Sequence, residues 1–517
     1  MPQIKRALIS VTDKTGVVEF TGALHQLGID IVSTGGTASA IRGANTPVRD
    51  IAELTGFPEM LDGRVKTIHP RVAAGILAIR SNASHLQSLV EHGIGLIDMV
   101  VVNLYAFEKV AARPDATVHE LIENIDIGGP TMIRAAAKNW QDVAVVTRPE
   151  DYDMILEELR TSTGSLSAAT CWRLAKQAFE LTALYDRAVT ARLASLTLEN
   201  GEFQDRPTEL PEVLVVQGPR VLDLRYGENP HQKAALYSLA PRGIASAKQL
   251  HGKELSYNNL VDLDAAWQLI AEFAGPAAAI IKHTNPCGCA EQNTLAEAYL
   301  KAFEADPVSA FGGVLAFNRE VDEETASEIA KTFIEAIAAP GYSQAALGLL
   351  TAKRNLRLLE VGPGQDALVL KSVSGGILAQ TPDQVALDRN TARVVTKRAP
   401  TEEEWRALEF GWKVCKHVKS NAIVFARAGQ SVSAGAGQMS RLDSVKMGAL
   451  KAVLSLEGTV LASDAFFPFP DGVEEAAKHG ITAVVQPGGS VKDDAVIHAA
   501  DRLGLAMVFT GIRHFRH

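Results

Sequence analysis

The sequence predicts an α/β protein built on open sheets, and three observations carry that prediction. Short β-branched runs alternate with Ala- and Leu-rich helical patterns over the first part of the chain, as in a parallel sheet with helical crossovers. The chain has 517 residues, too many for one ordinary hydrophobic core, so about two to four domains are expected. Hydrophobic residues make up 47% and charged residues 21%, a composition typical of a globular enzyme.

Charge and composition exclude several classes of protein. The net charge of -9 argues against non-specific binding of nucleic acid, which needs a basic face, although a local anion site remains compatible with it. No apolar run approaches the roughly 18–20 residues of a membrane helix, and the apolar run after the first cations is too short for a signal peptide. Four cysteines are too few for a disulfide framework. We therefore expect a soluble, cytoplasmic protein with no membrane or nucleic-acid partner.

The predicted strands of the first domain are short and separated by helical patterns. The interval 150–198 has apolar residues at spacings of three and four, which predicts helices. The strand candidates are ALISV (7–11), DIVS (30–33), DMVVVNLY (98–105) and DVAVVT (142–147). Together they predict one α/β domain over residues 1–198.

A polar segment with two prolines, residues 199–212, is the best candidate for a linker. The region 213–517 again mixes strand and helix patterns and is long enough for two packed units. Turn residues and charges cluster near 381–405, which predicts the internal boundary there. We detect no short-period repeat.

Polar residues follow several N-terminal strands. ALISV leads to Thr12–Gly16, DIVS leads to Thr34–Ala40, and VVVNLY delivers Asn103 and Tyr105. In open α/β sheets ligands bind beyond the carboxyl ends of strands, and a glycine-rich helix start offers free N–H groups to an anion. The alternative for the TGGT segment is an ordinary glycine turn with a threonine cap.

Two further N-terminal segments combine charged and polar residues. GRVKTIHP (63–70) contains Arg64, Lys66, Thr67 and His69 in one stretch, with a solvated basic loop as the alternative. Asp126 precedes two glycines and Pro130 at a predicted helix start, where it could also be a simple cap. Lys138 lies near the far end of that helix, so only tertiary folding could bring it to Asp126.

The segment IKHTNPCGC (281–289) allows three kinds of chemistry. Zinc deaminases need P-C-x-x-C and an upstream H-x-E, whereas one residue separates Cys287 from Cys289 here and no H-x-E occurs. A nucleophilic thiol needs a base within reach, and the glycine turn favours small buried cysteines instead. An acid–base pair of Lys282 and His283 remains, because histidine titrates near neutrality and a desolvated lysine can act as an acid. Its alternative is a hydrogen-bonded histidine beside a surface lysine.

Other polar and aromatic clusters surround this pair in the sequence. They are Arg225, Tyr226 and His231 in LRYGENPHQ, Phe311 before a Gly-Gly pair, Asn421 in KSNAI, Arg441 after a glycine loop, the aromatic turn SDAFFPFPDG (463–472), and the cationic end GIRHFRH. Exposed aromatic rings would form a pocket for a flat ring.

These segments are similar to a known family. SVTDKTG, STGGT, TGFPEMLDGRVKTIHP and IDIGGPTMIRAAAKN resemble the cyclohydrolase half of the PurH family of bifunctional purine-biosynthesis enzymes (AICAR transformylase / IMP cyclohydrolase). LRYGENPHQ, IKHTNPCG, SAFGG, KSNAI, GAGQMSR, SDAFFPF and RHFRH resemble its transformylase half. The resemblance runs in order from about residue 7 to 517.

The resemblance implies an activity, a fold and a set of partners. The family transfers the formyl group of 10-formyltetrahydrofolate to AICAR and then closes formyl-AICAR to IMP with loss of water. It implies a methylglyoxal-synthase-like N-terminal domain and two cytidine-deaminase-like units that lack zinc. It also implies small-molecule substrates, a homodimer with shared transformylase sites, no catalytic metal, and room for a structural monovalent cation.

The resemblance also implies site residues. In the transformylase region Lys282 and His283 match the catalytic pair and Asn421 the residue that orients it. The matching binding residues are Arg225, Tyr226, His231, Phe311, Gly312, Glu335, Arg441, Phe466, Pro468, Phe469, Arg513 and His517. In the cyclohydrolase domain the catalytic group is Lys66, Tyr105, Asp126 and Lys138, and the phosphate and ribose contacts are Ser10, Thr12, Lys14, Gly35, Gly36, Thr37, Arg64 and Thr67.

Two other classes compete with this interpretation. A zinc-dependent nucleotide deaminase is disfavoured by the missing H-x-E motif. A non-catalytic nucleotide-binding regulator would have the same scaffold, but every catalytic position carries a chemically competent side chain.

Overall fold

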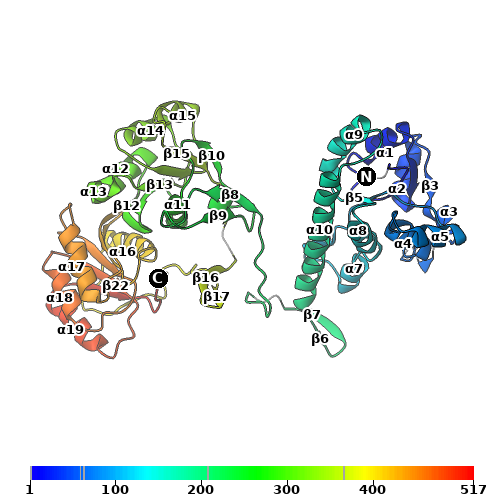
Figure 1. Cartoon of the computed structure of the whole chain (residues 1–517). Coiled ribbons are helices and arrows are strands. Elements are labelled where there is room, and N and C mark those ends of the chain that lie inside the picture. Colours follow the sequence, from blue (N-terminus) through cyan, green and yellow to red (C-terminus); the bar gives the residue numbers. More distant parts are fainter. Residues whose placement is uncertain (1–2, 59, 62–63, 207–208, 365–366) are drawn as a thin grey trace. The chain divides into compact units, whose positions relative to one another are not determined.

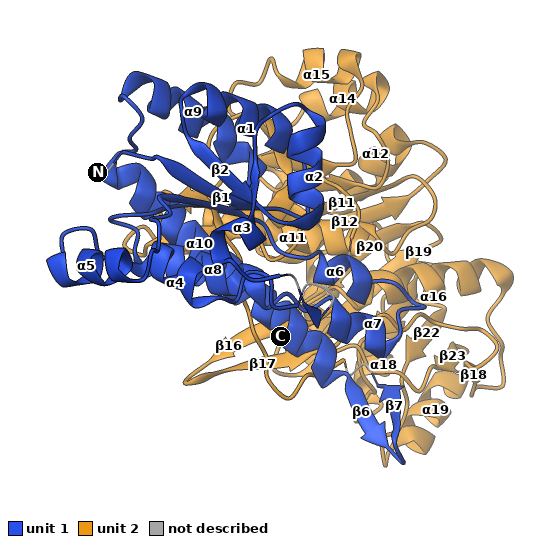
Figure 2. Ribbon diagram, turned by 90° about the vertical axis from the view of Figure 1, so that its right-hand side faces the viewer, with its two compact units in different colours: residues 1–208 blue, residues 209–517 orange. Residues whose placement is uncertain are grey.

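The computed structural model describes residues 3–58, 60–61, 64–206, 209–364 and 367–517. The chain forms two compact units, Met1–Thr208 and Glu209–His517, shown in separate colours in Figure 2. The division falls inside the predicted linker 199–212, of which residues 207–208 lie outside the described residues, as does Gly63 of the GRVKTIHP segment. Part of that linker has regular structure, because strands β6 (Leu196–Glu199) and β7 (Glu202–Asp205) pair as a hairpin.

The N-terminal unit contains a five-stranded sheet in the order β3-β2-β1-β4-β5, in which every pair is parallel. The predicted strands are present at nearly the predicted positions. The strands are β1 (Arg6–Ser10), β2 (Asp30–Ser33), β3 (Arg49–Asp50), β4 (Met99–Val102) and β5 (Ala144–Val146). The helices are α1 (Val17–Gln26), α2 (Gly35–Gly43), α3 (Ile51–Thr55), α4 (Pro70–Leu77), α5 (Ala83–Glu91), α6 (Phe107–Ala111), α7 (Val118–Glu123), α8 (Gly128–Lys138), α9 (Tyr152–Thr161) and α10 (Ala168–Ala194). The predicted α/β class is confirmed.

Burial explains why the strand patterns were apolar throughout. Every residue of β4 and of β5 is buried, which requires cover on both faces of the sheet, as parallel sheets have. The long helix α10 contributes one apolar side to this core and leaves the other exposed. Within the described residues no helix combines the length and the apolar character that a membrane span requires.

The C-terminal unit is organised around one sheet of twelve strands, in the order β10-β15-β14-β13-β11-β12-β20-β19-β21-β22-β23-β18. The strands are β10 (Lys248–His251), β11 (Ala277–Lys282), β12 (Asn285–Glu291), β13 (Val314–Phe317), β14 (Ala336–Ala339), β15 (Arg357–Glu360), β18 (Arg393–Val394), β19 (Ile423–Arg427), β20 (Gln430–Gly435), β21 (Val460–Ser463), β22 (Ala483–Gln486) and β23 (Ala506–Phe509). The helices are α11 (Tyr257–Ile270), α12 (Leu295–Ala305), α13 (Pro307–Ala310), α14 (Glu323–Ala330), α15 (Gln344–Leu350), α16 (Glu402–Cys415), α17 (Arg441–Lys451), α18 (Asp471–Ala477) and α19 (Asp493–Arg502).

The two halves of this sheet repeat each other. Read from either edge to the centre, each half has the same succession of an antiparallel edge strand, three strands paired in parallel, and an antiparallel hairpin. The helices repeat too: α11 and α16 both have 14 residues and begin with a capping box, at Ser256 and Thr401. The C-terminal unit therefore contains two repeated α/β halves that share one sheet.

The two repeats have separate outer cores and one shared inner core. Residues of α11 and α16 lie together in one apolar cluster with β11, β19 and β21. The helices α12, α14 and α15 cover the first repeat, and α17, α18 and α19 cover the second (Figure 1). At the centre, β12 pairs with β20 at Ala290 and Gln430.

Two hairpins lie outside the large sheet. They are β8 (Arg220–Leu224) with β9 (Ala234–Tyr237), and β16 (Val369–Val373) with β17 (Gly376–Gln380). The turn between β8 and β9 carries the predicted LRYGENPHQ residues, and Asn258 of α11 donates to the Glu228 carbonyl in that turn.

Candidate active sites

The first candidate site lies at the carboxyl ends of the parallel strands of the N-terminal unit. Asn103, just after β4, accepts from the backbone N–H groups of Thr12 and Asp13 at 2.6 and 3.1 Å and donates to the Asp13 carbonyl. One carboxamide therefore holds the loop that follows β1. Ser10, the last residue of β1, shares a hydrogen bond of 3.0 Å with the Thr34 hydroxyl.

The glycines of the TGGT segment form the first turn of α2 rather than a separate turn before it. The helix begins at Gly35, and Thr34 makes no capping bond with its side chain. The N–H groups of the first helical residues have no acceptor within a helix, and the helix dipole adds partial positive charge there. A Cβ at Gly35 would lie 3.4 Å from Nζ of Lys66, and one at Gly36 would lie 4.0 Å from Nζ of Lys14. Two ammonium groups thus converge on a helix start, which suits a phosphate.

Asp126 lies just before α8 and is close enough to Lys66 to feel its charge. Its Oδ1 accepts from the Gly129 N–H at 2.8 Å, so the carboxylate does cap α8. Burial raises the pKa of Asp126, with hydrogen bonds from the backbone of Gly129 and Tyr105 and the charge of Lys66 opposing the rise. A carboxyl with a raised pKa near a lysine is suited to proton transfer.

Tyr185 of α10 was not identified from the sequence as part of this region. Its hydroxyl accepts from the Asp126 N–H at 2.7 Å and donates to the Asn124 carbonyl at 3.1 Å. It therefore fixes the loop that presents Asp126. A tyrosine 59 residues away in a long helix has no local sequence signal that would reveal this contact.

Two predicted residues lie differently from expectation. Lys138 is exposed at the last residue of α8, and an 11-residue helix is roughly 15 Å long, so the structure does not bring Lys138 to Asp126. Arg64 is exposed and forms an ion pair with Glu123, so its guanidinium is bound to a carboxylate here. Thr67 is buried and Tyr105 exposed.

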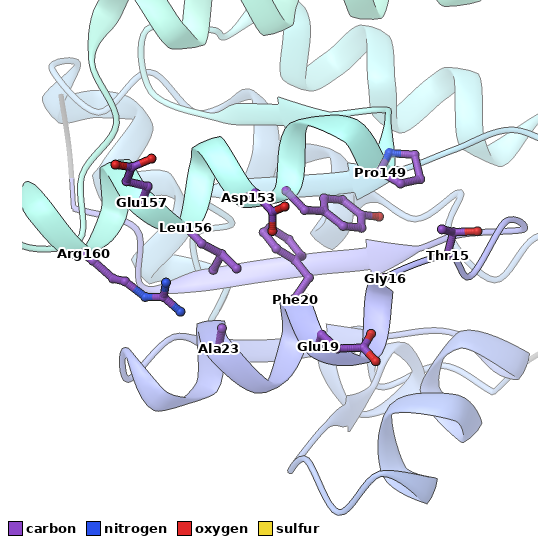
Figure 3. A pocket seen from close by; sticks show the side chains of 11 residues that line it. Thr15, Gly16, Glu19, Phe20, Ala23, Pro149, Asp153, Leu156, Glu157 and Arg160 are labelled. Carbon is purple, nitrogen blue, oxygen red and sulfur yellow. The ribbon is translucent and has the colours of Figure 1, made fainter.

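A cavity of about 640 Å³ also occurs in the N-terminal unit, between α1 and α9. Figure 3 shows the side chains that line it, among them Phe20, Glu19, Asp153 and Arg160. None of the predicted site residues lines it.

The second candidate site lies at one edge of the twelve-stranded sheet. Lys282 ends β11, and His283 follows it in the two-residue turn to β12. The His283 side chain is exposed, while Lys282 is half-buried and its Nζ donates to the Phe311 carbonyl at 2.9 Å. The imidazole is thus accessible to a substrate, as an acid–base role requires.

The second repeat supplies Asn421 to the same edge. Asn285 connects them, because its Nδ2 donates to the His283 carbonyl at 3.2 Å and its Oδ1 accepts from the Lys419 N–H at 3.0 Å. The Asn421 carboxamide donates to the carbonyls of Gln438 and Met439 at 2.9 and 3.2 Å. Its side chain is therefore fixed in orientation.

Arg441 differs from the predicted pocket-wall residue. Its side chain is buried, and its guanidinium donates to Asn421 Oδ1, to the Ser463 hydroxyl and to the buried Asp464 carboxylate. In this structure Arg441 supports Asn421 instead of lining an open wall. Asp464 also accepts from the Ser420 hydroxyl.

A cavity of about 820 Å³ in the C-terminal unit is lined by three predicted residues, Arg225, Tyr226 and Glu335, whereas Lys282 and His283 are not among its lining residues. Phe333, another lining residue, packs on Phe311 with ring centroids 5.3 Å apart, and Phe311 in turn receives the Lys282 hydrogen bond. Glu335 forms an ion pair of 2.7 Å with Arg357, also in the cavity wall. A cavity of this size accommodates a ligand of nucleotide size.

The remaining predicted residues come from several other segments of the C-terminal unit. The chain end is held next to Asn421, because the Ser420 N–H donates to the Arg516 carbonyl and the His514 N–H to the Asp464 carbonyl. Phe466 and Phe469 follow β21 and are 39% and 56% exposed, whereas Phe467 between them is buried. The other members are Gly312, beside Phe333, and the exposed Pro468, Arg513, His517 and His231.

The cysteines of the PCGC segment are packed, as expected. Cys287 and Cys289 belong to two different apolar clusters. Burial raises the pKa of the Cys287 thiol to about 12 and raises that of Cys289 as well. In the described part of the chain no group of three His, Cys, Asp or Glu side chains is arranged to hold a metal ion.

Each of the two units has titratable and cationic side chains at one edge of its sheet. This arrangement is typical of an enzyme with two active sites. A family model described as AICARFT/IMPCHase bienzyme matches residues 136–451, and one described as MGS-like domain matches residues 16–131. The chain belongs to the AICARFT/IMPCHase bienzyme family. It is a bifunctional enzyme of purine biosynthesis that transfers a formyl group from a folate-derived donor to AICAR and closes formyl-AICAR to IMP.

Two solved structures are similar to parts of the chain. One is described as the crystal structure of ForH; it is 35% identical, with a TM-score of 0.34, over 37% of this chain and 99% of that one. The other is a methylglyoxal synthase from Elizabethkingia anophelis NUHP1, 16% identical with a TM-score of 0.16, over 30% of this chain and 77% of that one.

Proposed function

We propose that the formyl donor is 10-formyltetrahydrofolate and that the two reactions take place in separate units. Formyl transfer is assigned to residues 213–517 and ring closure to residues 1–198. The proposal is supported by the exposed His283 imidazole, which directly follows the half-buried Lys282, and by the packing of Phe311, which accepts the Lys282 hydrogen bond, on Phe333 in the wall of the cavity of about 820 Å³. That juxtaposition is the observation on which the assignment of formyl transfer depends.

In formyl transfer, the amine of AICAR is a weak nucleophile because its lone pair is delocalised into the ring. His283 takes the proton of this amine as it attacks the formyl carbon, and Lys282 protonates the departing folate nitrogen. Asn421 orients the pair, held by Arg441 at 2.9 Å. Arg225 and Arg513 suit the ribotide phosphate, Tyr226 and His231 contribute polar contacts, and Phe311, Gly312, Glu335, Phe466, Pro468, Phe469 and His517 surround the rings.

In ring closure, the carboxamide nitrogen of formyl-AICAR attacks the formyl carbon and water then leaves. Lys66 and Tyr105 stabilise charge on the formyl oxygen, and Asp126, with its raised pKa, moves the proton. Ser10, Thr12, Lys14, Thr37, Thr67 and the N–H groups of Gly35 and Gly36 bind the phosphate and ribose. Arg64 also binds the substrate phosphate, after its ion pair with Glu123 breaks. Lys138 has no position in this scheme.

The proposal extends to assembly and location. A homodimer in the cytoplasm, with transformylase sites shared between chains, is proposed from the family alone. Sedimentation of the purified protein tests the first part, and fractionation of cells the second.

The test combines one assay with two variants. Wild-type protein given AICAR and 10-formyltetrahydrofolate should release tetrahydrofolate and yield IMP, identified by mass. His283→Ala should abolish formyl transfer and still cyclise supplied formyl-AICAR, while Lys66→Ala should give the mirror result. Loss of both activities in either folded variant would contradict the assignment to two centres.

A further inference from the structure

The turn that presents His283 has an uncommon backbone. His283 and Thr284 are the two central residues of the β11–β12 hairpin, and their φ angles are 52° and 61°. A two-residue hairpin with positive φ at both positions is usually built from Asn-Gly, Asp-Gly or Gly-Gly. Positive φ is especially unfavourable for a β-branched residue such as Thr284. Such a conformation persists only where the surroundings hold it.

One carboxylate holds both residues of this turn. Asp262 of α11 accepts from the Thr284 N–H through Oδ1 at 2.7 Å and from the His283 N–H through Oδ2 at 3.3 Å. The two oxygens of a carboxylate can accept from two donors at once, and hydrogen bonds to a charged acceptor are the stronger kind. The helix thereby fixes the backbone that carries the imidazole.

The second repeat shows what the same hairpin looks like without such a carboxylate. The equivalent hairpin, β19–β20, turns at Ala428 and Gly429, and there the positive φ, of 73°, falls on the glycine. Asp262 lies six residues after the capping residue Ser256, and the residue six after the capping Thr401 is Ala407, which is buried. Where glycine makes the turn, the helix carries alanine; where histidine and threonine make it, the helix carries aspartate.

We propose that Asp262 is a positioning residue for formyl transfer, acting by holding the His283–Thr284 turn in its left-handed conformation. The inference rests on the proposed role of His283 as the base. Nothing requires Asp262 to contact the substrate: it acts through the backbone of the turn. Its loss should therefore lower kcat and leave the binding of AICAR nearly unchanged.

The first test compares three variants in steady-state formyl transfer. Asp262→Asn keeps the size of the side chain but offers one oxygen in place of two and turns an NH₂ donor toward a backbone N–H. We expect kcat to fall about 10-fold in Asp262→Asn and about 100-fold in Asp262→Ala, since small misplacements of a catalytic group can cost a factor of this order, with KM for AICAR within about twofold. Asp264→Asn, on the exposed side of the same helix, should behave like wild type.

The second test is a rescue that acts on the turn itself. Glycine adopts positive φ without a steric penalty, whereas alanine does not. Asp262→Ala/Thr284→Gly should therefore recover several-fold of the lost kcat, and Asp262→Ala/Thr284→Ala should recover none. Equal kcat in both double variants would overturn the inference, as would a wild-type kcat in Asp262→Asn.

His283→Ala, assayed in parallel, separates the two hypotheses. If His283→Ala is inactive and folded Asp262→Asn is fully active, only the positioning role is wrong. If His283→Ala retains formyl transfer, the proposed base is wrong and the inference about Asp262 falls with it. Should Asp262→Ala fail to fold, the near-isosteric Asp262→Asn and the combination Asp262→Asn/Thr284→Gly decide the question by the same criteria.

Discussion

Arg441 donates a hydrogen bond of 2.9 Å to the Oδ1 atom of Asn421. The same guanidinium is paired with Asp464, a residue with no exposed surface. The buried ion pair thus links the stability of the second repeat to the orientation of a proposed catalytic side chain.

Arg441→Ala should abolish formyl transfer and destabilise the C-terminal unit by about 3–5 kcal/mol, because it leaves the Asp464 charge buried without a partner. Denaturant unfolding of the variant measures the loss. Arg441→Ala/Asp464→Asn should regain part of the stability but not the activity, because Asn421 still lacks its donor. A double variant as unstable as the single one would show that the unpaired charge is not the cause.

Asp126→Asn should abolish ring closure while the protein becomes no less stable. Because burial raises the pKa of this carboxyl, its ionised form costs stability once the pH is above its ordinary value of 3.8, and the amide removes that cost. We expect a gain of about 0–1 kcal/mol at pH 7, measured by denaturant unfolding. Asp153→Asn, at an exposed position of α9, should change neither property. A marked loss of stability in Asp126→Asn would argue that the cap on Gly129 outweighs desolvation.

The free energy of unfolding should decrease at acid pH because Glu272 becomes protonated; we call this decrease the acid limb. Burial alone would raise the pKa of this carboxyl, but hydrogen bonds from His417 and Lys416 outweigh it and lower the pKa to about 2. The stabilisation is complete above the ordinary value of 4.5 and is lost as the pH falls toward about 2. Glu272→Gln should cost on the order of 2 kcal/mol at pH 7 and should flatten this limb.

Burial also lowers the pKa of His417 from its ordinary value of 6.5. Below that pH the unfolded chain binds a proton at His417 more readily than the folded protein does, so stability falls with falling pH, as it does for Glu272. The limb of Glu272→Gln should therefore retain a component that begins as the pH falls below about 6.5. Unfolding curves from pH 7 to 3 separate the two groups. An unchanged limb in Glu272→Gln would assign the acid sensitivity to other residues.

Gly35→Ala should weaken binding of formyl-AICAR at the cyclohydrolase centre. The residue has a φ of 42°, and its Cβ would lie 3.4 Å from the Lys66 ammonium group, so the methyl group both strains the helix start and crowds the phosphate. KM for formyl-AICAR should rise about 10-fold or more, and formyl transfer should be unaffected. Gly43→Ala, at the other end of α2 with nothing within 4 Å of the added Cβ, is the matched control and should bind normally.

The sequence was most informative where a pattern was local. The run DIVS is β2 to the residue, because a parallel strand covered on both faces reads as a continuous apolar run. The start of α2 was misjudged by a few residues, since glycines are poor helix formers and the pattern alone suggested a turn before the helix.

Contacts between distant segments could not be predicted. Asp262 and Tyr185 hold the two proposed sites through hydrogen bonds that span 21 and 59 residues, and neither lies in a motif. The internal repeat was also hidden, because AAAIIKHTN and AIVFARAGQ both form buried strands with antiparallel hairpin pairing but have few identical residues. Burial of Arg441 depends on Asp464, which follows a different strand.

The shared twelve-stranded sheet has a mechanical consequence. At the seam, Ser431 exchanges hydrogen bonds with the backbone of Cys289, and Glu291 and Gln292 both donate to the Gly429 carbonyl. These hydrogen bonds join the two repeats into one continuous sheet, and the halves that carry His283 and Asn421 are held together across it. We therefore expect reactants to enter and leave by movement of loops and side chains at the edge of the sheet, and not by a hinge motion that separates the two repeats.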